Sequence, residues 1–163
     1  MNTHRYTWYE SPAGPLLLAG SRDGLYYLSF PSGRHAVAIE HEWIEDRSLF
    51  DDAIRQLREY FAGERTTFSL TLKPEGTDFQ RAVWAELQNI PYGETISYKE
   101  LADRIGRPKA VRAVGAANGA NPIPIIIPCH RVIGNDGSLT GFGGGLPLKK
   151  RLLELESRQL ALL

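Results

Sequence analysis

Short apolar runs separated by turn residues dominate the first thirty positions of the chain. Leu16–Ala19 and Leu25–Phe30 are apolar, and turn-forming segments precede them at Ser11–Pro15 and Arg22–Gly24. Alternation of apolar runs with such turns is typical of adjacent antiparallel strands. We therefore expect a strand, a turn and a second strand, followed by a polar stretch, 31–47, with only weak periodicity.

The next segment changes to helical spacing. Ser48 is a suitable N-cap and Gly63 a suitable stop for a helix between them. The apolar residues of that helix recur at intervals of three and four: Phe50, Ile54, Leu57 and Phe61. After it, alternation with polar residues predicts a half-buried strand at Phe68, Leu70 and Leu72. Lys73–Gly76 has the composition of a linker.

Short helices characterise the chain from Thr77 onward. Capping-box patterns begin at Thr77 and at Ser97. Pro108 suits the first position of a further helix, which Gly119 follows. Two short helices joined by a glycine-containing turn predict a helix-turn-helix. A last helix begins at Pro147, and its apolar stripe consists of Leu148, Leu152 and Leu155.

These patterns predict an α+β protein in two parts. Residues 1–76 are expected to form a small N-terminal α/β lobe with antiparallel strands, ending in the linker. Residues 77–163 are expected to form a mostly helical C-terminal domain that contains the helix-turn-helix. A chain of 163 residues, 42% hydrophobic and 23% charged, is long enough for one good core or for a small lobe beside a larger one.

Charge is distributed unevenly between the two parts, although the net charge of the chain is zero. Residues 1–76 hold 8 Lys/Arg and 11 Asp/Glu, a net of −3, whereas residues 77–163 hold 11 and 8, a net of +3. Basic residues concentrate over 99–112, within the predicted helix-turn-helix. An anionic partner is therefore expected to bind there, with modest affinity because the imbalance is modest.

Export and membrane insertion are not expected for this sequence. Its apolar runs are too short to span a bilayer, and Met1–Tyr6 lacks the apolar core of a signal peptide. The one cysteine, Cys129, cannot form an internal disulfide. These features favour a reducing, cytoplasmic location.

Cys129 is the residue around which a chemical site is expected. A lone thiol makes a poor metal site, so it is either a small buried hydrophobe or a nucleophile. His130 and Arg131 follow it, and both residue types can lower the pKa of a thiol. Adjacent side chains usually diverge, so His130 would act on the sulfur through a water molecule. Glu156, on the inward stripe of the last helix, would orient the histidine or would simply mark the edge of that stripe.

Two further motifs each have a functional and a structural interpretation. The helix expected over 108–118 is rich in small residues and leaves Arg112 as its main projecting side chain, which suits close approach to a nucleic-acid groove. A tightly packed helix pair in an ordinary core would show the same spacing. Gly141–Gly145 lacks the spacing of a phosphate-binding loop, and it is either a pocket wall or a flexible linker.

Several ordered segments together resemble the O6-alkylguanine-DNA alkyltransferases, also called methylated-DNA–protein-cysteine methyltransferases. The most specific segment is Pro128–Val132, PCHRV, with the apolar Ile125–Ile127 before it. The resemblance runs from Thr77 to Glu156 through GTDFQRAVW, IPYGETISY, KAVRAVGAANGANPIPIIIPCHRV and TGFGGG. SPAGPLLLAG near the N-terminus is similar too, and residues 31–47 are the least similar part.

The resemblance implies direct-reversal repair of DNA. Cys129 would accept the alkyl group from O6 of guanine, and also from O4 of thymine, in one irreversible turnover per molecule. His130 would activate the sulfur through a water, Glu156 would orient His130, and Tyr98 would support the leaving base. The base would first be flipped out of double-stranded DNA, and Arg112 would fill the gap that it leaves.

The same family pattern implies two binding surfaces. A helix in the minor groove would contact DNA through Tyr98, Ala110, Arg112, Ala113, Gly115 and Asn118. Asn121 would be the hinge between that helix and the cysteine segment, and the carbonyls of Cys129 and Val132 would bind the guanine amino group. The substrate pocket would be formed by Pro124, Val132, Phe142, Gly143, Gly144 and Lys149.

Two departures from the family pattern matter. Some members carry tyrosine and serine where this chain has Phe142 and Gly143, so a serine contact to the base is lost. Some members bind zinc through cysteines in the N-terminal part, and a chain whose only cysteine is Cys129 cannot build that site in that form. We expect no metal, no cofactor, no membrane contact and no obligate protein partner, with the protein acting as a monomer.

Three other functions remain open on the sequence. An alkyltransferase-like protein that binds lesions without catalysis is the nearest alternative, although such proteins replace the cysteine that this chain keeps. A cysteine hydrolase that uses Cys129 and His130 would release its product and turn over. A helix-turn-helix regulator would bind DNA by sequence, whether or not a lesion is present.

Overall fold

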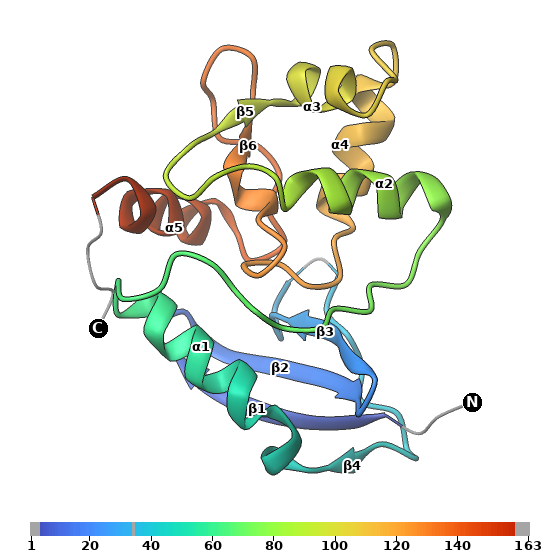
Figure 1. Ribbon diagram of the computed structural model, residues 1–163, viewed down its shortest axis with the longest axis vertical. Helices are drawn as coiled ribbons and strands as arrows, with labels where there is room; N and C mark the ends of the chain where they lie inside the picture. The colour runs from blue at the N-terminus through green and yellow to red at the C-terminus, as the bar shows by residue number, and fades with distance from the viewer. Residues whose placement is uncertain (1–3, 34, 159–163) are drawn as a thin grey trace.

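The computed structural model, which describes residues 4–33 and 35–158, has a sheet at one end and helices at the other (Figure 1). The four-stranded sheet has the order β3-β2-β1-β4, with antiparallel neighbours except for the parallel pair β1 and β4. The strands are β1 (Arg5–Ser11), β2 (Gly14–Ser21), β3 (Gly24–Ser29) and β4 (Ile44–Glu45). The expected strand–turn–strand is therefore present, as β2 and β3, and β1 precedes it.

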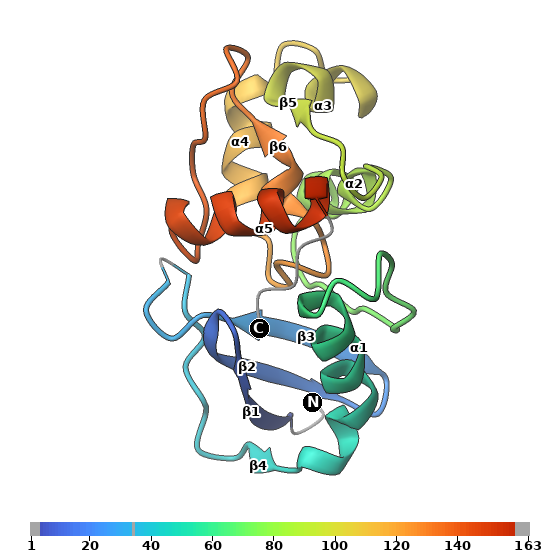
Figure 2. The ribbon, with the colours of Figure 1, turned by 90° about the vertical axis from the view of Figure 1, so that its left-hand side faces the viewer.

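One helix, α1 (Asp51–Phe61), packs beside this sheet (Figure 2). Its buried stripe contains the predicted residues Ile54, Leu57 and Phe61. The prediction that Ser48 is its N-cap is wrong, because a 3-10 helix at Arg47–Phe50 precedes α1. The Ser48 hydroxyl instead donates to the Asp46 carboxylate at 2.6 Å.

The strand predicted around Phe68–Leu72 does not form a ladder. Phe68, Leu70 and Leu72 are half-buried and their polar neighbours exposed, as the alternation predicts. Only Leu72 makes an isolated bridge, with Leu25, next to a hydrogen bond of 2.9 Å from the Leu25 amide to the Thr71 carbonyl. No ladder forms because the segment pairs with β3 only around Leu25.

The C-terminal part is mostly helical, as predicted. A two-stranded parallel sheet joins its segments, with β5 pairing with β6. Its elements are α2 (Asp78–Leu87), β5 (Ile96–Ser97), α3 (Tyr98–Arg104), α4 (Val111–Gly119), a 3-10 helix at Cys129–Arg131, β6 (Val132–Ile133) and α5 (Leu146–Arg158). None of the helices in the described residues has the length and hydropathy needed to span a bilayer.

The predicted helix-turn-helix is formed by α3 and α4, which pack against each other. Its second helix begins later than predicted: Pro108 lies in a turn in which the Ala110 amide donates to the Arg107 carbonyl at 2.9 Å. Gly119, expected after the helix, is its last residue. At the start of α3, Ser97 accepts from the Glu100 amide at 3.0 Å, which gives half of the predicted capping box.

The two parts of the chain share a continuous buried core. The cluster extends from Leu57 of α1 to Leu152 of α5. A backbone hydrogen bond of 2.9 Å also joins them, from the Leu28 amide of β3 to the Pro122 carbonyl after α4. Residues on both sides of the predicted linker are thereby brought to one site.

The capping box at Thr77 provides a test of how α2 is held. The Thr77 hydroxyl accepts from the Gln80 amide at 3.1 Å, and the Gln80 side chain accepts from the Thr77 amide at 3.0 Å. We expect Thr77→Ala to lower the free energy of unfolding by about 1 kcal/mol, because the Gln80 amide in the first turn loses its partner. Urea denaturation measures this, with the exposed Thr66→Ala as the control, which should change it by less than about 0.5 kcal/mol. Equal losses in the two variants would contradict the assignment.

Candidate active site

Cys129 begins a short 3-10 helix directly after a constrained apolar turn. The Ile127 amide donates to the Ile123 carbonyl at 2.9 Å, and Ile125 between them has a φ of 75°. That backbone region is unfavourable for a β-branched side chain and costs about 1–3 kcal/mol. The turn delivers Cys129 to the protein interior, where the residue is only 5% exposed.

The predicted pairing of His130 with Glu156 is present. His130 Nε2 lies 2.7 Å from Glu156 Oε2, and both side chains are buried. This contact orients the ring with Nδ1 on its other side, and Nδ1 is buried without a hydrogen-bond partner among the described residues. With Glu156 ionised, Nε2 carries the hydrogen and Nδ1 is left as a proton acceptor. This tautomer is the one that a general base needs.

Glu156 is the most densely bonded buried group of the site. Arg131 binds both of its oxygens, with Nε at 2.7 Å from Oε1 and Nη2 at 3.0 Å from Oε2. The Tyr60 hydroxyl of α1 donates to Oε2 at 2.6 Å. Burial raises the pKa of Glu156, but the charges of and hydrogen bonds from His130 and Arg131 outweigh it and lower this pKa to about 2. The carboxylate is therefore ionised at every physiological pH.

The predicted effect of Arg131 on the thiol is wrong. Its guanidinium is occupied by Glu156 and by the Ile90 carbonyl, to which Nη1 donates at 2.7 Å. Burial raises the pKa of Cys129 to about 11, against the opposing effects of a hydrogen bond to Asn121 and of the Lys149 charge. At neutral pH the sulfur is therefore protonated, and forming the thiolate requires a base.

Lys149 is fully buried next to this site. Its Nζ donates to the Val132 carbonyl at 2.7 Å and to the Thr140 carbonyl at 2.8 Å. Burial lowers the pKa of Lys149 to about 8, although the Cys129 sulfur acts in the opposite direction. The Val132 carbonyl, expected to bind the guanine amino group, thus already accepts one hydrogen bond and has a second lone pair for another.

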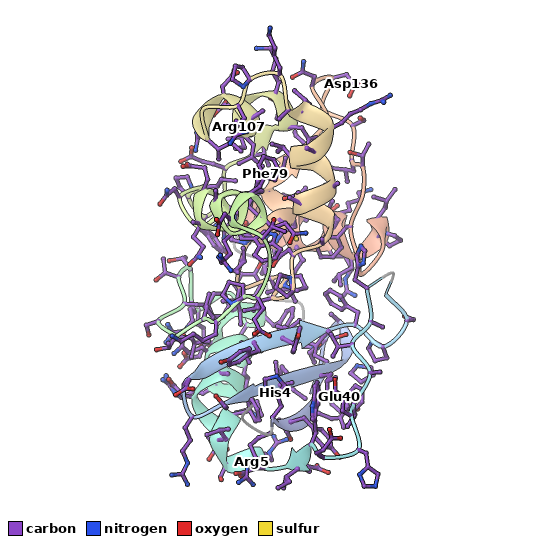
Figure 3. The ribbon with its side chains drawn as sticks, turned by 90° about the vertical axis from the view of Figure 1, so that its right-hand side faces the viewer. His4, Arg5, Glu40, Phe79, Arg107 and Asp136 are labelled. Carbon is purple, nitrogen blue, oxygen red and sulfur yellow. The ribbon has the colours of Figure 1, made fainter. Side chains whose placement is uncertain are left out.

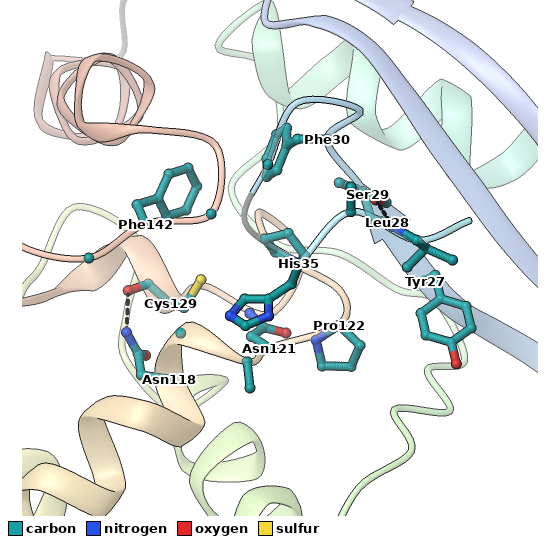
Figure 4. A pocket seen from close by; sticks show the side chains of 18 of the residues that line it. Tyr27, Leu28, Ser29, Phe30, His35, Asn118, Asn121, Pro122, Cys129 and Phe142 are labelled. Atoms are coloured by element: carbon teal, nitrogen blue, oxygen red, sulfur yellow. Dashed lines mark hydrogen bonds between the residues drawn. The ribbon is translucent and has the colours of Figure 1, made fainter. Parts of the chain in front are cut away.

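A cavity of about 210 Å³ opens beside the sulfur (Figure 4). Of the predicted pocket residues, Pro124, Phe142 and Gly143 line it, together with Asn121. Val132, Gly144 and Lys149 are not among its lining residues. Part of the wall comes from the sheet end of the molecule, through Tyr27, Ser29, Phe30 and His35. No pattern along the chain indicates this contribution.

The glycine-rich loop is a pocket wall rather than a linker. The Phe142 ring packs on Phe30, with ring centroids 5.7 Å apart. A Cβ at Gly144 would lie 2.8 Å from Leu148 Cδ2, and a Cβ at Gly33 would lie 2.7 Å from the Gly143 carbonyl oxygen. The loop can therefore approach its neighbours closely only because these two positions lack side chains.

Tyr98 and Asn121 bond to chain segments that lead into this pocket. The Tyr98 hydroxyl donates to the Thr140 carbonyl at 3.1 Å, just before the glycine-rich loop. The Asn121 side chain donates to the Ile127 carbonyl at 2.8 Å and accepts from the Ile123 amide at 2.9 Å. Asn121 thereby connects the end of α4 to the turn before Cys129, as a hinge would.

The helix-turn-helix presents its basic surface far from the acidic sheet end. Figure 3 shows Arg107, in the turn before α4, at the opposite end of the molecule from Glu40. On α4, Arg112 and Ala113 are exposed and Gly115 is half-buried beside the Tyr98 ring. Ala110 precedes the helix and is half-buried.

Asn118 does not belong with these surface residues. It is 2% exposed, lines the cavity, and its Nδ2 donates to the Cys129 carbonyl at 3.4 Å. Its assignment to the DNA contact surface is therefore wrong, because the last turn of α4 faces inward.

Tyr60 is the main residue that the sequence pattern missed. It lies on the buried stripe of α1, three residues after Leu57, where its spacing is that of an ordinary core residue. A fully buried tyrosine normally finds a partner for its hydroxyl, which was the available signal, but nothing in the sequence identifies that partner as Glu156.

Over 4–33 and 35–158, no group of three or more His, Cys, Asp or Glu side chains could hold a metal ion.

Two family models cover nearly the whole chain. Residues 4–74 match the ribonuclease-like domain of 6-O-methylguanine DNA methyltransferase, and residues 78–158 match its DNA binding domain. A methylated-DNA–protein-cysteine methyltransferase from Methanosarcina barkeri is 56% identical, covering 95% of this chain and 98% of the relative. One from Mycobacterium tuberculosis is 54% identical, covering 93% and 91%.

Solved structures agree with these relatives. Mycobacterium tuberculosis OGT in complex with DNA superposes with a TM-score of 0.90 at 51% identity, covering 98% of this chain and 95% of that one. The O6-methylguanine methyltransferase of the same organism gives a TM-score of 0.88, covering 96% and 94%. On sequence and fold alike, the chain belongs to the 6-O-methylguanine DNA methyltransferase family.

Proposed function

We propose that this protein repairs double-stranded DNA by transferring an alkyl group from O6 of guanine to Cys129, once per molecule. The observation that carries the proposal is the buried Cys129 beside a cavity, next to a His130–Glu156 pair whose free Nδ1 is a proton acceptor. The relatives' names, and a DNA complex of one of them, support it. O4-alkylthymine is included as a second substrate.

The chemistry is a displacement at the alkyl carbon. The thiol proton passes through a water molecule to His130 Nδ1, and the resulting imidazolium is stabilised by Glu156. The sulfur forms a bond to the alkyl carbon as the bond from that carbon to O6 breaks. The guanine leaves as an anion, with Tyr98 supporting the base, and takes up one proton, which balances the proton that the thiol gave to His130. The product is a thioether, and the chain has no second thiol to accept its alkyl group.

Because the Cys129 thiol is buried, a base must remove its proton before it can react. Since the pKa of Cys129 is about 11, very little thiolate exists at neutral pH without proton transfer. The same burial makes the anion more nucleophilic once it forms, because few water molecules solvate it. His130 and Glu156 therefore supply the base that the buried sulfur needs.

DNA is bound through the helix-turn-helix. We assign the contact surface to Tyr98, Ala110, Arg112, Ala113 and Gly115, with Arg112 filling the gap left by the flipped base. Small residues on α4 allow close approach to the minor groove. The flipped base is held by Pro124, Phe142 and Gly143, with Asn118 added to this set. Val132, Gly144 and Lys149, which do not line the cavity, support its wall, and Lys149 bonds to the Val132 carbonyl.

The wider setting is also part of the proposal. We assign residues 1–76 to an N-terminal lobe and linker, and 77–163 to the DNA-binding and alkyl-acceptor domain. The protein acts as a monomer in the cytoplasm, where a reducing environment keeps its single cysteine free.

Intact mass spectrometry tests the transfer directly. After incubation with duplex DNA that carries O6-methylguanine, we expect each molecule to gain the mass of one CH2 group, located at Cys129. Cys129→Ala should bind the same duplex and gain nothing, because it lacks the acceptor sulfur. Continued turnover by the wild type would contradict the mechanism and favour a hydrolase. Binding without any mass increase would favour the lesion-binding alternative.

Arg112→Ala tests how the base reaches the site. We expect the rate of transfer from duplex DNA to fall by roughly tenfold or more, because the flipped state loses the side chain that replaces the base. The rate at which iodoacetamide alkylates Cys129 should not change, since Arg112 is exposed on α4. Arg22→Ala, an exposed arginine in the β2–β3 turn, controls for loss of one positive charge. A similar fall in that variant would show that general electrostatics, rather than base replacement, is responsible.

A further inference from the structure

The N-terminal lobe contributes one atom to the proton relay. Tyr60, in the last turns of α1, is fully buried, and its hydroxyl donates to Glu156 Oε2 at 2.6 Å. This contact joins residues 96 positions apart in sequence. Tyr60 is not among the residues that line the cavity beside Cys129.

Tyr60 shares its acceptor atom with the catalytic histidine. Oε2 lies 2.6 Å from the Tyr60 hydroxyl and 2.7 Å from His130 Nε2. On the basis of the function proposed above, we infer that Tyr60 is a positioning residue of the relay, which sets how strongly Glu156 holds the imidazolium that forms on His130. The N-terminal lobe would thus determine the pH range over which the sulfur can be activated.

The Tyr60 hydroxyl is not needed to orient the Glu156 carboxylate. Arg131 already fixes the plane of the carboxylate, because its Nε and Nη2 bind the two oxygens separately. What the hydroxyl adds is a neutral donor on the oxygen that faces His130. Each donor withdraws negative charge from that oxygen and weakens its attraction for a neighbouring cation.

The other charged and titratable groups around this carboxylate come from two segments. Arg131 is on the 3-10 helix, and Tyr92, in the segment after α2, has its ring 5.7 Å from the Arg131 guanidinium carbon. Tyr60 is packed by Phe61, Phe68 and Tyr92. Burial and the Glu156 charge raise the pKa of Tyr60 well above its usual value, so its hydroxyl remains a neutral donor.

The direction of the effect follows from the shared oxygen. Without the Tyr60 hydroxyl, Oε2 recovers charge and binds the imidazolium more tightly. The protonated ring then persists to higher pH, and a protonated ring cannot accept the thiol proton. Activation of Cys129 should therefore fail at a higher pH than in the wild type.

Tyr60→Phe tests this inference, because it removes the hydroxyl and keeps the ring. We would measure the rate of methyl transfer from duplex O6-methylguanine, and separately the rate of iodoacetamide alkylation of Cys129, from about pH 5 to pH 8. We expect the acid limb of both profiles to move up by about half to one pH unit, which is roughly a three- to tenfold lower rate on that limb. The rate at high pH should stay close to that of the wild type.

Tyr92→Phe is the matched control. Its hydroxyl lies in the same aromatic cluster but faces the Leu155 carbonyl, at 3.5 Å, instead of Glu156. Its profile should coincide with that of the wild type. Coincident profiles for wild type and Tyr60→Phe, or an equal shift in Tyr92→Phe, would overturn the inference.

A second variant keeps the test decisive if Tyr60→Phe does not fold. Replacing Tyr60 by 3-fluorotyrosine retains the hydroxyl and makes it a stronger donor, so the acid limb should move to lower pH. A shift to higher pH, or none, would count against the role proposed for Tyr60. Failure of the proposed function is distinguishable, because the wild type itself would then transfer no methyl group although iodoacetamide still reports on Cys129.

Discussion

The buried carboxylate of Glu156 is the interaction on which the site depends. A charge removed from water is strongly unfavourable unless it is paired and hydrogen-bonded. Four hydrogen bonds, from Tyr60, His130 and Arg131, provide that compensation. These donors come from α1 and from the 3-10 helix after Cys129, whereas the carboxylate is on α5. The fold thus brings three distant segments together at one anion, and the histidine's tautomer is a consequence.

The unfavourable free energy of burying a charge also governs the chemistry of the sulfur. Cys129 is protonated at rest because burial disfavours its anion, and Lys149 has a pKa lowered to about 8 because burial disfavours its cation. Each charge would stabilise the other if both formed. The sulfur at such a site reacts only as fast as a base can take its proton, so the His130–Glu156 pair controls its reactivity. The constrained turn at Ile125 and the Asn121 contacts keep the sulfur at the cavity meanwhile.

Residue patterns along the chain predicted the elements that depend on local periodicity and capping. The stripe of α1, the Thr77 capping box and the helix-turn-helix are all present. Predictions that depended on distant partners were less accurate. Phe68–Leu72 alternates like a strand but has almost no strand to pair with, and Asn118 faces inward because the Cys129 segment lies behind α4. Tyr60 and the pocket wall from β3 could not be found from spacing, since both are created by the docking of one part of the chain on the other.

The bond from Leu28 to Pro122, with the one from Tyr60 to Glu156, has a consequence for how such proteins can be recombined. The boundary between the two family-model matches, near residues 74–78, suggests exchanging one half for that of a relative. Each half, however, holds buried hydrogen-bonding groups whose partners lie in the other half. An exchanged N-terminal half must therefore place a tyrosine hydroxyl and a strand amide where Tyr60 and Leu28 have theirs. The two parts are therefore not freely exchangeable. The reactivity of Cys129 in a chimera will depend on how well the two halves fit together.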